Sequence, residues 1–122
     1  MARSRDMAPS VLIVDDHADF RSSARALLEL QGFQVVGDAE DGCAALAAAA
    51  SLQPDVVLLD VQLPDMDGFE VAERLAGSAH SPRVVLISSR HRSAYEARLP
   101  DAPVVGFLGK HELSGNALAA LL

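Results

Sequence analysis

Five short apolar runs recur along the chain, and they limit its fold more than any other feature of the sequence. The runs are rich in β-branched residues and mostly continuous, without the alternation of a half-exposed strand. Continuous runs of this kind are typical of strands buried on both faces of a parallel sheet. They cover residues 11–14, 35–36, 56–59, 84–87 and 104–108.

Segments with helical spacing lie between these runs. The first has apolar residues on one face over residues 20–28 and ends near Gly32, where a helix terminus favours a left-handed residue. Asp41 and Asp67 are predicted to cap the next two helices, and residues 113–121 form a last apolar stripe. The pattern therefore predicts a helix after the first, second, third and fifth strands.

The segment 93–99 has the weakest helical pattern, because it is short and is followed by Pro100 and Pro103. With this segment counted as a helix, strand and helix alternate five times. Such alternation predicts an α/β fold: a doubly wound, five-stranded parallel sheet of order 2-1-3-4-5 in a flavodoxin-like three-layer sandwich. We expect one domain over residues 10–122, preceded by a flexible tail over residues 1–9.

The composition argues against several classes of function. A formal net charge of −7 disfavours a nucleic-acid surface, which needs clustered Lys and Arg. The apolar runs are too short to span a bilayer, and the first residues lack the pattern of a signal peptide. Cys43 is the only cysteine, can form no internal disulfide and is expected to be an ordinary small helix residue. These features favour a cytoplasmic protein.

Polar residues follow four of the five apolar runs. Asp15 and Asp16 end the first run, Asp60 the third, and Ser88 the fourth, while Lys110 follows the fifth. In an open parallel sheet the functional crevice lies beyond the carboxyl ends of the strands, at the switch point between neighbours. If the first and third strands are neighbours, three carboxylates converge on that crevice.

Three close carboxylates repel one another, and an oxygen-only cluster of this kind favours Mg²⁺. Lys110, the only lysine, would add a compact positive charge, and Ser88 would offer a hydroxyl to a bound oxyanion. A cation, an ammonium and a hydroxyl around a carboxylate nucleophile make a phosphoryl site. Each residue alone has a plainer interpretation: a helix-capping or turn aspartate, a solvated loop lysine, a turn serine. Their joint placement favours the phosphoryl site.

From residues 10 to 122 the chain resembles the receiver domains of bacterial response regulators, of the type that continues into a helix-turn-helix effector. The matching stretches are VLIVDDH (11–17), DVVLLDVQLPDMDGFE (55–70), VVLISS (84–89), GFLGK (106–110) and ELSGNALAALL (112–122). The second stretch is the most specific, with Pro64 four residues after Asp60 and Gly68 eight residues after it.

The resemblance implies a role for each site residue. Asp60 would be the phosphoacceptor, and Asp16 and Asp60 would bind Mg²⁺ directly. Asp15 would support the metal through water, and Gln62 would contribute its backbone carbonyl. Ser88 and Lys110 would contact the phosphoryl group. The other implied roles are structural: Pro64 stiffens the exit from the strand, and Gly68 starts the next helix without a Cβ.

Two departures from the family pattern leave questions open. Phe107 occupies the position of the switch aromatic, often Tyr, so it has no hydroxyl; it is either a switch that acts by packing or a core residue. His111 follows Lys110 where many members have Pro, and a cis peptide costs about 3 kcal/mol without proline. Whether that bond is cis stays open on the sequence.

The remaining histidines give weaker signals. His17 is expected to cover the start of the first helix, and His80 and His91 to be solvated loop residues. With no second soft ligand at metal spacing, a zinc site is not expected.

The resemblance implies a signalling switch, not an enzyme in the usual sense, with a histidine kinase as phosphoryl donor. Homodimerisation through the last two helices is implied by the resemblance alone, and DNA binding would require an effector domain beyond Leu122. The main alternative is a pseudo-receiver that binds proteins without phosphorylation. A Mg²⁺-dependent phosphatase using Asp60 is a second alternative, disfavoured because position 62 is Gln and the Asp-x-Asp spacing is missing.

Overall fold

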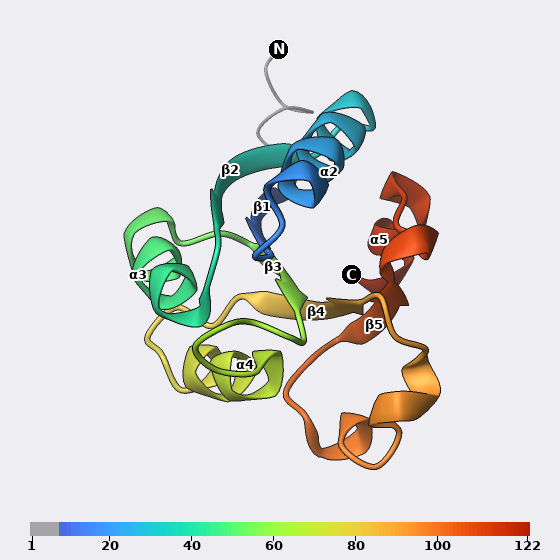
Figure 1. Ribbon diagram of the computed structural model, residues 1–122. Helices are drawn as coiled ribbons and strands as arrows, with labels where there is room; N and C mark the ends of the chain where they lie inside the picture. The colour runs from blue at the N-terminus through green and yellow to red at the C-terminus, as the bar shows by residue number, and fades with distance from the viewer. Residues whose placement is uncertain (1–7) are drawn as a thin grey trace.

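The computed structural model describes residues 8–122, in which five parallel strands form one sheet (Figure 1). The strand order is β2-β1-β3-β4-β5, as the sequence predicted. The strands are β1 (Ser10–Val14), β2 (Gln34–Ala39), β3 (Val56–Asp60), β4 (Arg83–Ser88) and β5 (Gly106–Gly109). The predicted tail lies outside the described residues except for Ala8 and Pro9, and the Pro9 carbonyl accepts a hydrogen bond from Gln34.

Within residues 8–122, four α-helices cover the two faces of the sheet and complete three layers. They are α2 (Ala18–Leu30), α3 (Gly42–Leu52), α4 (Gly68–Ala76) and α5 (Gly115–Leu121). Helices α3 and α4 pack on one apolar cluster, and α2 and α5 pack on the other. The doubly wound fold is therefore confirmed.

The strands are continuously apolar because successive residues serve opposite cores. In β1, Leu12 and Val14 belong to the cluster under α3 and α4, while Val11 and Ile13 belong to the cluster under α2 and α5. All four side chains are fully buried. Every residue of β3 is buried as well, so the central strand is a stiff base for the residues at its carboxyl end.

The helix boundaries follow the local chemistry of the sequence. The Asp41 side chain accepts a hydrogen bond from the Ala44 amide at 2.7 Å, which caps α3 as predicted. Asp67 caps α4 in the same way. Gly32, after α2, has a φ of +96°, the left-handed backbone that glycine adopts without steric cost.

Two predictions about the second half of the chain are wrong. Residues 93–99 do not form an α-helix; β4 and β5 are joined by the 3₁₀ helices η1 (Arg92–Tyr95) and η2 (Leu99–Asp101). Pro100 lies inside η2, where it stops a longer helix. The fifth strand begins at Gly106, two residues later than the apolar run.

The second strand is longer than its apolar run, because it extends from Gln34 to Ala39. It lies at the edge of the sheet, where one side needs no apolar partner, so its length left little trace in the sequence. Cys43 is exposed on α3, as expected for an ordinary helix residue. Within residues 8–122, no helix has both the length and the apolar character that crossing a membrane requires.

Candidate functional site

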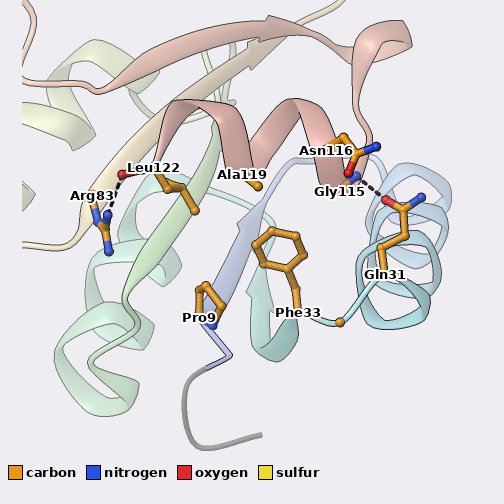
Figure 2. A pocket seen from close by; sticks show the side chains of 9 residues that line it. Pro9, Gln31, Phe33, Arg83, Gly115, Asn116, Ala119 and Leu122 are labelled. Carbon is orange, nitrogen blue, oxygen red and sulfur yellow. Dashed lines mark hydrogen bonds between the residues drawn. The ribbon is translucent and has the colours of Figure 1, made fainter. Parts of the chain in front are cut away.

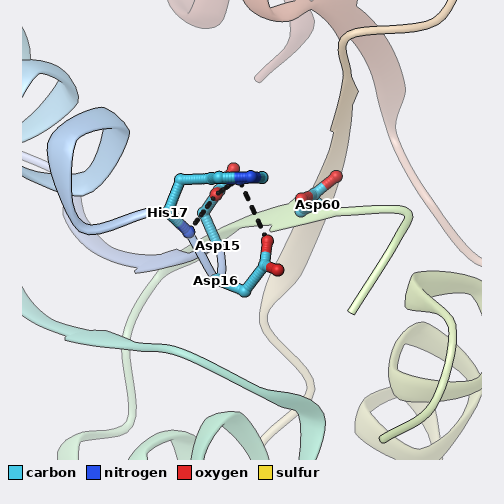
Figure 3. Close-up of side chains that lie close together, drawn as sticks. All are labelled: Asp15, Asp16, His17 and Asp60. Carbon is cyan, nitrogen blue, oxygen red and sulfur yellow. Dashed lines mark hydrogen bonds and ion pairs between the residues drawn. The ribbon is translucent and has the colours of Figure 1, made fainter. Parts of the chain in front are cut away.

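The fold brings the residues singled out at the strand ends to one edge of the sheet. Asp60 is the last residue of β3, Ser88 the last of β4, and both are buried. Asp15 directly follows β1 and is fully buried, whereas Asp16 is exposed. Strand β1 pairs with β3, so Asp15 and Asp60 lie side by side. Figure 3 shows Asp15, Asp16 and Asp60 drawn together beyond the strands.

Lys110 lies between the two buried carboxylates. Its Nζ atom is 2.6 Å from Asp15 Oδ2 and 3.4 Å from Asp60 Oδ2. Burial opposes the charged ammonium, but the hydrogen bonds and the negative charges of both aspartates outweigh it and raise the pKa of Lys110. The only lysine of the chain is therefore held as a cation against Asp15 and Asp60.

The ionised form of Asp60 is disfavoured despite the nearby Lys110 ammonium. Burial, followed by the negative charge of Asp15, raises the pKa of Asp60 from 3.8 to about 6. The amide of Gln62, 3.2 Å from Asp60 Oδ1, and the charge of Lys110 offset only part of this. The carboxylate form of Asp60 would therefore gain from a further positive charge at this edge.

The donor atoms at this edge suit a hard cation. One ligand atom each from Asp15, Asp16, His17 and Asp60 lies within 4.8 Å of the others. Asp15 Oδ2 is buried and receives no hydrogen bond of regular geometry from the described residues; its close neighbour is the Lys110 ammonium. Three of the four groups are carboxylates, the oxygen donors that Mg²⁺ prefers, so the residues present fit a magnesium ion.

His17 has a place in this cluster that the sequence did not reveal. Its backbone is the N-cap of α2, as expected, but its side chain makes no capping hydrogen bond. The ring turns toward the carboxylates instead, with Nδ1 3.0 Å from Asp15 Oδ1 and 3.1 Å from Asp16 Oδ1 (Figure 3). Its position next to two aspartates was the only signal in the sequence.

The loop after β3 is pressed closely onto the strand. Gly68, the first residue of α4, donates a hydrogen bond to the Val61 carbonyl at 2.7 Å. A Cβ on Gly68 would lie 2.5 Å from the carbonyl oxygen of Asp60, too close for any other side chain. The expectation that this glycine starts the helix without a Cβ is confirmed. Asp65, in the same loop, accepts hydrogen bonds from the amides of Gly42 and Cys43, both at 2.8 Å.

Ser88 is bonded away from the carboxylates. Its Oγ atom accepts a hydrogen bond from the Arg90 amide at 2.9 Å and lies 3.1 Å from the hydroxyl of Tyr95. The Tyr95 ring lies between Phe69 and Phe107, with centroid distances of 5.9 and 5.7 Å. Phe107 is buried in this aromatic cluster, and the phenol beside Ser88 comes from Tyr95, which sequence reasoning missed.

The other open points are settled by the backbone and by exposure. The described residues contain no cis peptide bond, so the bond between Lys110 and His111 is trans. His80 and His91 are exposed, as expected. His80 Nε2 lies 2.9 Å from the Pro54 carbonyl oxygen, and His91 Nδ1 accepts a hydrogen bond from the Ser93 amide.

Comparison with known proteins gives this arrangement a family. Residues 11–121 match the response regulator receiver domain. The chain belongs to the response regulator receiver domains. The predicted resemblance is therefore confirmed.

Individual relatives agree with this family assignment. The chain is 38% identical over 101 residues to the response regulator GacA of Pseudomonas aeruginosa, and the match covers 82% of this chain and 47% of GacA. It is 36% identical over 106 residues to BvgA of Bordetella pertussis, named as a positive transcription regulator of virulence factors, covering 87% of this chain and 51% of BvgA. The signal receiver domain of NarL from Mycobacterium tuberculosis superposes with a TM-score of 0.82 at 34% identity, covering 93% of this chain and 96% of that one.

Membership has general consequences for the receiver domain. Receiver domains are signalling domains of two-component systems, not conventional enzymes, and response regulators are phosphorylated by histidine kinases. Receiver domains generally bind Mg²⁺ at an acidic pocket, and this chain has the acidic cluster. The chain spans about half the length of the curated relatives that it matches, among them regulators of transcription.

A pocket of about 520 Å³ lies away from the acidic edge of the receiver domain, at the amino ends of the strands (Figure 2). Its rim ties α5 to the rest of the fold, because Gln31 accepts a hydrogen bond from the Gly115 amide and Arg83 donates one to the Leu122 carbonyl at 2.9 Å. None of its lining residues belongs to the acidic cluster.

Proposed function

We propose that this receiver domain is a phosphorylation switch in which Asp60 accepts a phosphoryl group from a histidine kinase. The observation that carries the proposal is the position of the Asp60 carboxylate, buried at the end of the central strand beside the Lys110 ammonium that it shares with Asp15. This carboxylate has both a nucleophilic oxygen and a cation already in place beside it.

The transfer involves one bond made and one bond broken. A carboxylate oxygen of Asp60 attacks the phosphorus of phosphohistidine; the new P–O bond forms as the P–N bond breaks. The electron pair of the P–N bond stays on the imidazole of the kinase, which takes up a proton from solvent. The product on this chain is a mixed anhydride of carboxylic and phosphoric acids, and attack of water on it returns Asp60 and inorganic phosphate.

Asp15, Asp16, Asp60 and the backbone carbonyl of Gln62 would hold Mg²⁺. When bound, this ion supplies positive charge opposite the phosphoryl oxygens. The pKa of Asp60 is raised to about 6, so the carboxyl keeps its proton below that pH. Positive charge from a bound Mg²⁺ would favour the carboxylate, which is the form that reacts, and this supports the assignment. The Gln62 amide already orients the Asp60 carboxylate from the other side.

Lys110 and Ser88 have separate roles in this proposal. Lys110, 3.4 Å from Asp60 Oδ2, would contact a phosphoryl oxygen and lower the barrier to charge build-up during transfer. Ser88, at the end of the neighbouring strand β4, would turn its hydroxyl toward the phosphoryl group once transfer is complete. Phe107 would respond by repacking in its aromatic cluster, since it carries no hydroxyl.

The output of the switch would be control of transcription, through an effector domain of the helix-turn-helix type joined to this domain. The support is the similarity to BvgA, which is named as a transcription regulator. A formal charge of −7 makes DNA contact by the receiver domain itself unfavourable. A cytoplasmic location and homodimerisation through the segment 93–99 and α5 belong to the same proposal.

Incubation with acetyl phosphate tests the proposal without the cognate kinase. With Mg²⁺ present, intact-protein mass spectrometry should show one added phosphoryl group, located on Asp60 by reduction and peptide mapping. EDTA and Asp60→Asn should each abolish it. Lys110→Gln should slow it about 100-fold, because one charge-stabilising donor is lost. Asp101→Asn, a change of an exposed aspartate away from the site, is the matched control.

Absence of an adduct in the unmodified protein would contradict the proposal and favour the pseudo-receiver, which binds a protein partner without phosphorylation. A Mg²⁺ titration followed by backbone amide shifts decides the same question independently. The amides of residues 15–17 and 60–62 should shift in a saturable way, and a domain that docks without phosphorylation has no reason to show this.

A further inference from the structure

Tyr95 is the single buried residue in the stretch that joins β4 to β5. From Ser89 to Val105 every other residue is at least partly exposed, whereas Tyr95 is 7% exposed. The stretch contains only the short 3₁₀ helices η1 and η2, so little of its own backbone bonding holds it in shape. Tyr95 is therefore the most deeply buried apolar anchor of the stretch, and Leu99, Ala102 and Val104 pack partly buried against the same cluster.

The ring and the hydroxyl of Tyr95 make different contacts. The ring packs between Phe69 of α4 and Phe107 of β5, at tilted angles of 49° and 47°. The hydroxyl points to the end of β4, where it lies 3.1 Å from Ser88 Oγ. A single side chain thus joins the stretch to the proposed site and to the neighbouring layers.

The hydrogen bonding of Ser88 makes this contact sensitive to the state of Asp60. Among the described residues, Ser88 Oγ bonds to the Arg90 amide and the Tyr95 hydroxyl, and to neither carboxylate. The contact with the Tyr95 hydroxyl, 3.1 Å long, exists with Ser88 Oγ in its present rotamer, and a turn of the side chain toward Asp60 moves Oγ out of that position.

The packing beside Tyr95 leaves room for the stretch to move. Cavities of about 380 and 140 Å³ lie between this stretch and β5. Arg92 and Phe107 line both of them, and the Arg92 guanidinium lies 5.9 Å from the centroid of the Phe107 ring. This space beside β5 allows the stretch to shift without displacing other side chains.

We propose that the Tyr95 hydroxyl holds Ser88 in its resting position, and that phosphorylation of Asp60 withdraws Ser88 and releases Tyr95 with the stretch 89–105. This inference rests on the proposed function. The aromatic hydroxyl that holds Ser88 is therefore that of Tyr95 on the connecting stretch, because Phe107 on β5 has none. Tyr95 is a positioning residue here, because it acts through Ser88 and does not touch the phosphoryl group.

The chain has one tyrosine and no tryptophan, so its intrinsic fluorescence comes from Tyr95 alone. The experiment measures acrylamide quenching of this emission before and after treatment with acetyl phosphate and Mg²⁺, with the adduct verified by mass. We expect the quenching constant to rise about twofold or more as the ring leaves its buried site. In Asp60→Asn it should stay at the resting value.

Substitutions of Ser88 test the link between the two groups. Ser88→Ala should raise the resting quenching constant toward that of the phosphorylated protein and reduce the further change on phosphorylation by more than half. Ser88→Thr keeps a hydroxyl and should respond like the unmodified chain. Ser89→Ala, which changes the adjacent exposed serine, should leave the resting value unchanged.

Tyr95→Phe gives a readout that would not change if Tyr95 had only a structural role. The variant keeps the ring between Phe69 and Phe107 and loses only the hydroxyl, so it should fold normally. With Ser88 released in advance, its hydroxyl can reach the phosphoryl group without giving up Tyr95, so the adduct formed with acetyl phosphate should last about fivefold longer, the factor expected for one hydrogen bond. An adduct lifetime equal to that of the unmodified protein would overturn the inference.

The proposed function and this inference are contradicted by different results. If no adduct forms, the proposed function is wrong and this inference falls with it. If the adduct forms and the quenching of Tyr95 is unchanged, the inference alone is wrong. An increase in quenching that follows adduct formation and is reduced in Ser88→Ala supports both.

Discussion

The two connections that flank β4 are built in contrasting ways. The connection from β3 to β4 contains α4, which is capped by Asp67 and buries five of its nine residues. The connection from β4 to β5 has two 3₁₀ helices and one buried residue, Tyr95. Both connections start at a proposed site residue, Asp60 in the first case and Ser88 in the second.

This difference separates two tasks within one site. A nucleophile must be held in a fixed position, and Asp60 lies at the start of the tightly packed connection. A residue that responds to phosphorylation of the nucleophile must be able to change hydrogen-bond partners, and Ser88 lies at the start of the loosely packed connection. The stiffness of a connection thus indicates which role its first residue can have. The predictions below test this contrast.

The largest effect is expected from Gly68→Ala, which forces the tight connection apart. The added Cβ would lie 2.5 Å from the Asp60 carbonyl oxygen and 2.9 Å from Val61 Cα, both backbone atoms that cannot turn away. The free energy of unfolding should fall by roughly 3 kcal/mol or more, measured by urea denaturation.

Gly77→Ala is the matched control for this change. Gly77 follows the same helix with ordinary right-handed backbone angles, and a Cβ there would meet nothing nearer than 3.8 Å. It should be neutral or stabilise by about 0.5 kcal/mol. Equal losses for both glycines would show that the close approach of α4 to β3 does not matter.

A gain in stability is expected from Asp60→Asn in the absence of divalent cations. The pKa of Asp60 is raised from 3.8 to about 6, so the folded state binds this proton more tightly than the unfolded state. The charged carboxyl therefore destabilises the fold increasingly from pH 4 to pH 6 and fully above pH 6. At pH 7 the variant should be more stable by roughly 2 to 3 kcal/mol.

The pH dependence distinguishes this cause from a change in packing. Below pH 4 the carboxyl is protonated in both states, so the advantage of Asp60→Asn should vanish in urea titrations with EDTA. An advantage that is the same at pH 4 and pH 7 would mean that burial of charge is not its origin. Asp101→Asn, at an exposed position, should show no such trend.

The smallest effect is expected at Asp67, which links the two connections. Its Oδ1 atom caps α4 through the Glu70 amide at 2.9 Å, and its Oδ2 atom accepts from Arg98 of the loose stretch at 3.1 Å. Asp67→Ala should cost about 1 kcal/mol of unfolding free energy. Asp67→Asn keeps a good cap and loses only an exposed ion pair, so it should cost less than about 0.5 kcal/mol.

Hydrogen exchange adds a local readout to this pair of variants. Loss of the ion pair should speed exchange in residues 92–101 and leave α4 unchanged in Asp67→Asn. If Asn is as destabilising as Ala, the contact with Arg98 and not the cap of α4 carries the stability at this position.

The sequence predicted the features that depend on local patterns. Strand order, the caps at Asp41 and Asp67 and the gathering of Asp15 and Asp60 all followed from buried runs and the residues at their ends. The fold then placed Lys110, which follows β5, between the carboxylates. These features are robust because each is set by burial or by a single backbone requirement.

The features that were missed depend on how side chains turn. The ring of His17 could extend from the start of α2 in several directions, and only the two carboxylates draw it back. Tyr95 stands in a polar stretch with no periodic pattern, seven residues after Ser88, so nothing in the sequence marks it as buried. The expected helix at 93–99 failed for the related reason that no continuous apolar face lies there to hold one.

The two hydrogen bonds from the amides of Gly42 and Cys43 to Asp65 have a mechanical consequence. They clamp the loop after β3 onto the first turn of α3, while Gly68 clamps its other end onto the strand. The side of the site toward α3 is therefore braced at two points. A displacement that begins at Asp60 meets least resistance in the opposite direction, toward β5, so partners that distinguish the two states of the domain should bind on that side.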